Sequence, residues 1–91
     1  MSKETTINIE VEDQPLEFHI SIEDFNEYQN ECLNGQTGLV TASHNFLVRT
    51  VSKETSTALS GFLRDVPGAA IDIGGAVIGK YKKPLKITVG K

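Results

Sequence analysis

The residues of this chain that could take part in chemistry are few and lie far apart. The two histidines, His19 and His44, have no cysteine or second histidine at the spacing of a metal site. The single cysteine, Cys32, falls on the apolar face of the helix expected around it, where a buried and unreactive thiol is the usual role. We therefore expect no metal site and no thiol nucleophile.

The acidic residues and the glycines do not suggest an active site either. Glu23, Glu27 and Glu31 recur every four residues and share one face of a helix, which is typical of a solvated ridge. The glycines around residue 74 lack the Lys and the Ser or Thr of a phosphate-binding loop. The sequence thus predicts a protein that is not an enzyme and binds no cofactor.

Charge is distributed unevenly along the chain, whose formal net charge is −3. Residues 1–32 contain nine acidic residues and one lysine, whereas residues 33–91 contain eight basic and three acidic residues. This polarity could steer a partner or order head-to-tail association, although two ordinary solvated surfaces would give the same pattern. The basic cluster at residues 80–83 is too small for a nucleic-acid surface on an acidic chain, so we expect no nucleic-acid partner.

The sequence also indicates the cellular compartment in which the protein is expected. No apolar run reaches the roughly 18 residues that a membrane-spanning helix needs. The N-terminus lacks the apolar core of a signal peptide, and one cysteine cannot form an internal disulfide, which agrees with a reducing compartment. We expect a cytoplasmic protein without a membrane segment.

Residues 5–12 and 15–21 are predicted to form a β-hairpin. Apolar and polar residues alternate in both stretches, as in strands with one dry face, and a short polar segment joins them. The alternation returns in residues 84–90, which predicts a third antiparallel strand. The apolar positions of the three strands are Ile7, Ile9, Val11, Leu16, Phe18, Ile20, Leu85, Ile87 and Val89.

A first helix is predicted over residues 22–33. Ser21 and Asp24 have the spacing of a capping box, although Glu or Gln is the usual third residue of that motif. Gly35 is suited to end the helix because it adopts the left-handed conformation without a Cβ clash. Residues 35–42 are expected to form a loop.

Two further helices are predicted over residues 43–51 and 53–65, with a bend between them. Ser52 is a favourable N-cap for the second, because its hydroxyl can accept a hydrogen bond from a backbone N–H. The second helix has the clearest apolar stripe in the chain, formed by Leu59, Phe62, Leu63 and Val66. We expect this pair of helices to be the centre against which the other elements pack.

Residues 67–81 are compatible with two structures. A tight hairpin is possible because Gly74-Gly75 tolerates positive φ in a turn. The alternative is a helix capped by Asp65, in which each interior glycine would cost about 1 kcal/mol relative to alanine. The apolar spacing favours the helix, which would then depend on tertiary packing.

These elements predict a small α+β fold. A chain of 91 residues has room for one hydrophobic core, so we expect a single domain over residues 1–91. In that domain the hairpin and the C-terminal strand form one antiparallel sheet that packs on three or four helices.

Four short motifs are shared with a known family. They are IEDFNEY at residues 22–28, HNFLVRTV at residues 44–51, VPGAAIDIGGAVIGKY at residues 66–81 and the closing LKITVGK. With these motifs and its N-terminal strands, the chain resembles the small tail assembly chaperones of tailed phages and prophages. The resemblance implies a protein of the host cytoplasm that binds the tape-measure protein during tail assembly and is absent from the mature virion.

A chaperone of this kind needs an exposed apolar surface rather than an active site. The candidate partner-binding residues are Leu39, Val40, Phe46, Leu47 and Tyr81, each of which would fit equally well into the core. The expected partners are the tape-measure protein, the tail-tube protein and a second copy of the chain. Two alternatives are a small structural tail or connector subunit of the virion and a regulatory inhibitor unrelated to phage.

Overall fold

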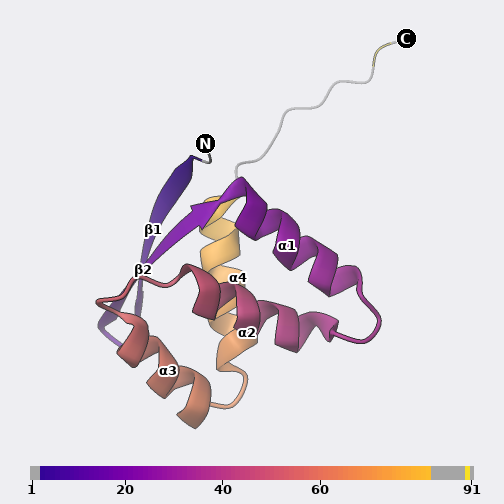
Figure 1. Cartoon of the computed structure of the whole chain (residues 1–91). Helices are drawn as coiled ribbons and strands as arrows, with labels where there is room; N and C mark the ends of the chain where they lie inside the picture. The colour runs from indigo at the N-terminus through magenta and orange to yellow at the C-terminus, as the bar shows by residue number, and fades with distance from the viewer. Residues whose placement is uncertain (1–2, 83–89, 91) are drawn as a thin grey trace.

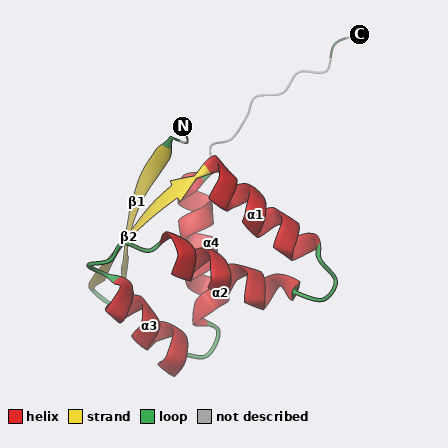
Figure 2. Ribbon diagram, in the orientation of Figure 1, coloured by secondary structure: helices red, strands yellow, loops and turns green. Residues whose placement is uncertain are grey.

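The chain begins with a β-hairpin whose two strands pair along their full length (Figures 1 and 2). The structure, a computed structural model, describes residues 3–82 and residue 90. Strand β1 spans Glu4–Val11 and strand β2 spans Gln14–Ser21, as the alternating pattern predicts. Glu12 and Asp13 join them with φ values of 51° and 65°. Two positive φ angles define a type I′ turn, whose twist matches that of the paired strands.

One face of the hairpin is dry. Ile7, Leu16, Phe18 and Ile20 are buried there, whereas Thr6, Asn8 and Glu10 on the opposite face are exposed. A two-stranded sheet is marginal in water and needs a layer across its apolar face. The helices supply that layer.

Helix α1, Ile22–Leu33, begins at the predicted capping box. The Asp24 amide donates to the Ser21 hydroxyl at 3.1 Å, and the Ser21 amide donates to the Asp24 carboxylate at 3.0 Å. The same carboxylate lies 3.4 Å from the Arg49 guanidinium, which also donates to the Asp24 carbonyl. Asp24 therefore starts α1 and links it to the next helix.

Helix α2 spans Gly38–Thr50, so the expected loop over residues 35–42 is wrong in its second half. Asn34 follows the last residue of α1, and its carbonyl accepts from the amides of Thr37 and Gly38 at 3.1 and 3.3 Å, which tightens the four-residue connection between the helices. The added helical turn carries Ala42 into the core, where it is fully buried. Tertiary packing therefore extends the helix beyond what its own sequence indicates.

Helix α3 spans Ser56–Asp65 and begins later than the predicted start at residue 53. Ser52 does not cap it. The Ser52 amide instead donates to the Glu17 carbonyl at 2.7 Å, and the Thr55 hydroxyl accepts from the Glu17 amide at 3.2 Å. Residues 52–55 are held against the outer edge of β2, and α3 starts only after them.

Helix α4 spans Ala69–Tyr81, so residues 67–81 adopt the helical alternative rather than a hairpin. Gly68, with φ of 78°, allows the chain to turn sharply between α3 and α4. Gly74 lies against α2, and a Cβ atom at its position would be 3.3 Å from the Ser43 Cβ. The glycine that disfavours the isolated helix is thus what permits close packing of the two helices.

Helix α2 occupies the centre of the fold, between α1 and α3 and across α4 (Figure 1). Its side chains Phe46 and Leu47 join a core that also contains Ile7, Leu16, Phe18, Ile20, Leu59, Ala69, Ile73 and Val77. The result is a small compact α+β fold with a two-stranded antiparallel hairpin and four helices in the described residues. The predicted C-terminal strand over residues 84–90 lies, except for residue 90, outside the described residues. Within residues 3–82, no helix has the length and apolar character needed to span a membrane.

The hairpin turn gives a first test of the fold. Glu disfavours positive φ and Asp only tolerates it, whereas Asn-Gly is a preferred type I′ sequence. We expect the double substitution Glu12→Asn/Asp13→Gly to stabilise the protein by about 1 kcal/mol, which raises Tm by about 4–8 °C in a domain of this size. Glu12→Gln, which removes a charge without relieving the backbone, should leave Tm nearly unchanged. A lower Tm for the Asn-Gly variant would contradict the turn.

The adjacent glycines of α4 give a second test, because their surroundings differ. Gly75 faces open space, so Gly75→Ala should stabilise the helix by up to about 1 kcal/mol. Gly74→Leu should destabilise the protein by about 1–3 kcal/mol, because the new side chain meets α2 at Ser43. Urea unfolding measures both effects. If Gly75→Ala were destabilising, the helix would be contradicted in favour of a glycine turn.

Candidate functional site

A mostly apolar groove lies where α2, the end of α3 and the start of α4 meet. It encloses about 550 Å³ and is lined mainly by Val40, His44, Leu63, Val66, Pro67 and Ile71. We call it the α2–α4 groove. It exists because the chain reverses at Pro67-Gly68, which leaves the end of α3 and the start of α4 side by side below the first half of α2 (Figure 1).

The walls of the groove include large apolar side chains in contact with solvent. Val40 is 63% exposed and Val66 is 46% exposed. Leu39, next to Val40 at the start of α2, is 52% exposed and extends the apolar surface. A group of exposed apolar side chains beside a hollow is typical of a protein-interaction site.

Polar groups from α2 and from the end of α3 also line the groove. The Arg64 guanidinium lies 3.1 Å from the Asp65 carboxylate, and this exposed pair raises the pKa of Arg64 through its hydrogen bonds. His44 is exposed on α2. These groups leave both a positive and a negative charge available to a partner.

The structure places the five predicted partner-binding residues in different environments, some on the surface and some in the core. Leu39 and Val40 lie on the surface, as that role requires. Phe46 and Leu47 are 0% exposed and face the hairpin, so no partner can reach them while the fold is intact. The sequence could not assign these positions, because an apolar residue on a helix fits a core and an interface equally well.

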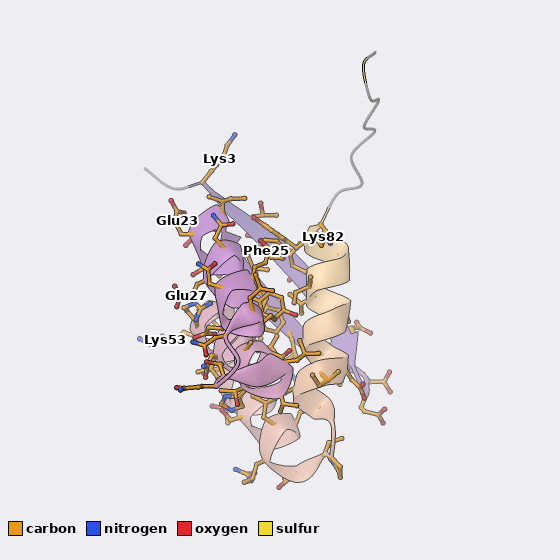
Figure 3. The ribbon with its side chains drawn as sticks, turned by 90° about the vertical axis from the view of Figure 1, so that its right-hand side faces the viewer. Lys3, Glu23, Phe25, Glu27, Lys53 and Lys82 are labelled. Atoms are coloured by element: carbon orange, nitrogen blue, oxygen red, sulfur yellow. The ribbon has the colours of Figure 1, made fainter. Side chains whose placement is uncertain are left out.

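Tyr81 lies on a different part of the surface from the α2–α4 groove. Its ring centroid is 5.5 Å from that of Phe25, and the cluster continues through Tyr28 to Phe46. Phe25 lies between α1 and α4, whereas Glu23 and Glu27 lie on the side of α1 away from α4 (Figure 3). Burial raises the pKa of Tyr28, and the neighbouring Cys32 raises it further. This cluster joins α1 to α4 and is only half-buried, so Tyr81 mainly packs within the protein.

The sequence prediction missed Val66 and Ile71 as groove residues. Val66 was assigned to the buried stripe of its helix, but α3 ends at Asp65 and the following Val66 turns outward. The signal that could have identified it is the Pro67-Gly68 pair, which stops the helix one residue after Val66.

The lining of the groove is suited to binding an apolar surface. Among residues 3–82 and residue 90, no group of three or more His, Cys, Asp and Glu side chains is arranged to hold a metal ion. The groove itself contributes apolar surface, one imidazole and one ion pair. Such a surface suits the apolar face of a helix from another protein.

Comparison with known proteins supports a role in assembly. A family model described as "Phage tail assembly chaperone" matches residues 7–91, which is nearly the whole chain. Neither a curated protein nor a solved structure matches the chain.

A pair of aspartate substitutions tests the division between surface and core. Val40→Asp should change the free energy of unfolding by no more than about 0.5 kcal/mol, since the side chain is already in water. Phe46→Asp should leave the protein unfolded, because a charge replaces a fully buried ring. Circular dichroism and urea unfolding measure both. A folded Phe46→Asp variant would contradict the core position of α2.

Proposed function

The chain belongs to the phage tail assembly chaperone family, and on that premise we propose that it binds a helical segment of the tape-measure protein during tail assembly. The observation that carries the proposal is the exposed apolar α2–α4 groove. The proposed client is a long helical protein with apolar stripes, as the resemblance implies. A chaperone that covers such a stripe keeps the client from aggregating.

The size of the groove sets what it can hold. A volume of about 550 Å³ accommodates a few side chains rather than a whole helix. We infer that one or two turns of the client dock, with apolar side chains at i and i+4 entering between Val40 and Val66. Contacts of this number give reversible binding, as release into the growing tail requires.

Charge supports a preferred orientation. The groove carries the Arg64–Asp65 pair on one side, and the exposed acidic side chains of α1 belong to the negative N-terminal third of the chain. Complementary charges accelerate encounter and disfavour wrong orientations more than they add affinity. The tail-tube protein and a second copy of the chain are further partners that we propose for these surfaces.

The place of action follows from the same proposal. A chaperone of tail assembly works in the cytoplasm of the host cell, where the tape-measure protein is made. We propose that it is released during assembly and is therefore absent from the mature virion.

Co-expression with the tape-measure protein of the same genome tests the function. The protein should raise the soluble yield of the client and co-elute with it on size exclusion. Val40→Asp/Val66→Asp should weaken the complex at least about tenfold, as expected when central apolar contacts are lost.

The matched control is Val48→Asp. Val48 lies on the same helix and is 52% exposed, but it does not line the groove. This variant should retain binding, with circular dichroism confirming that all variants are folded. Equal client yield with and without the protein, and no complex on size exclusion, would overturn the proposal. A ring or tube formed by the protein alone would favour a structural tail subunit instead.

A further inference from the structure

Helix α1 contains no buried residue, in contrast to the other three helices of the described chain. Five residues of α2 and four of α4 are buried, and α3 contributes Leu59 to the core. α1 lies at the edge of the fold, against α2 and the end of β2 (Figure 1). The apolar residues at its two ends, Ile22 and Leu33, are 56% and 86% exposed. Burial of apolar surface therefore holds α1 less firmly than it holds its neighbours.

The sequence of α1 also makes it a weak helix by itself. Glu23, Glu27 and Glu31 recur at every fourth position, and like charges at this spacing destabilise a helix. The segment contains no basic residue, so the acids in its second half lie unfavourably near the negative end of the helix dipole. Asn26 and Asn30 have low helix propensity. α1 therefore depends on its contacts with the rest of the fold.

The position of Glu31 opposes this docking. One oxygen of its carboxylate is shielded from solvent and has no hydrogen-bond partner among the described residues. A carboxylate oxygen that loses water without gaining a partner destabilises the docked state. Opening of α1 would return this oxygen to water.

An ion pair fastens the first turn of α1 to α2. The Arg49 guanidinium lies 3.4 Å from the Asp24 carboxylate and donates to the Asp24 carbonyl at 3.1 Å. Within residues 3–82, the second half of α1 forms no ion pair with another element. The attachment is therefore concentrated near the start of the helix.

Aromatic contacts attach the inner face of α1. The ring centroid of Tyr28 lies 5.3 Å from that of Phe46, and the ring centroid of Phe25 lies 5.5 Å from that of Tyr81. Phe25 extends between α1 and α4 (Figure 3). Phe46 is fully buried with α1 in place, whereas the other three rings are half-buried. Without α1, the ring of Tyr81 and the side of the Phe46 ring that Tyr28 contacts would face solvent.

We propose that α1 is a lid, which opens by local unfolding while the other helices stay folded, and that the uncovered surface of Phe46 and Tyr81 binds a helix of the client. The role in client binding rests on the function proposed above, whereas the opening does not. α1 itself shows what this surface accepts. The occupant is a helix with an acidic residue directed at Arg49 and two large apolar side chains three residues apart, as Phe25 and Tyr28 are.

Native-state amide hydrogen exchange of the full-length protein tests the opening. The amides of residues 26–33, which are hydrogen-bonded within α1, should exchange at least about tenfold faster than those of Phe46 and Leu47 after correction for intrinsic rates. Low concentrations of urea should accelerate the α1 amides less than the α2 amides, because local opening exposes less surface than global unfolding. Equal protection of the two helices at every urea concentration would overturn the proposal, since α1 would then open only with the whole fold.

A charge substitution tests whether α1 opens for the reason given. Glu27→Lys replaces two like-charge pairs along α1 by two opposite-charge pairs, so it should slow exchange of the α1 amides about three- to tenfold and leave Phe46 unchanged. The matched control, Glu54→Lys, makes the same change of charge at an exposed position outside α1 and should alter neither helix. If Glu27→Lys slowed the two helices equally, or neither of them, α1 would not be a separate unit.

Binding of the tape-measure protein separates the lid from the α2–α4 groove. If the client must wait for α1 to open, Glu27→Lys should weaken the complex about three- to tenfold, the factor by which it slows opening, and Glu54→Lys should not weaken it. Equal affinity of Glu27→Lys and the wild type, with α1 opening slowed, would overturn the role of the lid and leave the groove proposal standing. The absence of any complex with the wild type would overturn both proposals for client binding, and exchange in the free protein would still decide whether α1 opens.

Discussion

The fold depends on the burial of α2 against the apolar face of the hairpin. Neither partner is stable alone, since a two-stranded sheet and a helix of 13 residues are both marginal in water. Phe18 and Ile20 of β2 meet Phe46 and Leu47 of α2, and all four side chains are excluded from solvent. Each element supplies the apolar surface that the other needs, and α1, α3 and α4 then pack around this centre.

This central contact also decides how the flanking segments are used. Because α2 ends beside β2, the residues that follow it lie along the β2 edge and bind the backbone of Glu17. The Ser52 hydroxyl accepts from the Thr55 amide at 3.3 Å in the turn that precedes α3, and α3 itself begins only at Ser56. On its other side α2 approaches α4 so closely that a Cβ atom at position 74 would lie 3.3 Å from the Ser43 Cβ, a tighter contact than is usual. Residues 52–55 therefore cover the edge of β2 at Glu17, and α4 lies beside β1.

The α2–α4 groove is a consequence of the same arrangement rather than of a dedicated motif. The sharp reversal at Gly68 places two helix ends next to α2, and three helices that converge at a corner cannot fill it completely. The apolar residues that remain there, Val40 and Val66, have no place in the core. A protein that covers the apolar surface of a client, as we propose for this one, needs such a region.

The sequence by itself determined the elements whose signals are local. Strict alternation gave both strands of the hairpin, the Ser21–Asp24 capping box gave the start of α1, and the apolar spacing of residues 67–81 favoured a helix over a turn. The resemblance to tail assembly chaperones also came from the sequence and agrees with the family match. These local signals predict the structure correctly because each depends only on residues that are close together in the sequence.

Only the tertiary structure decided which apolar residues are buried and which remain exposed. Leu39 and Val40 differ from Phe46 and Leu47 in no local property, yet the first pair lies in water and the second is fully buried. The start of α2 at Gly38 and the late start of α3 were also beyond the sequence, because packing on Ala42 and the backbone of Glu17 outweighed local propensity. Helix periodicity identifies an apolar face, but the partner that covers it comes from distant parts of the chain, and that pairing decides between core and surface.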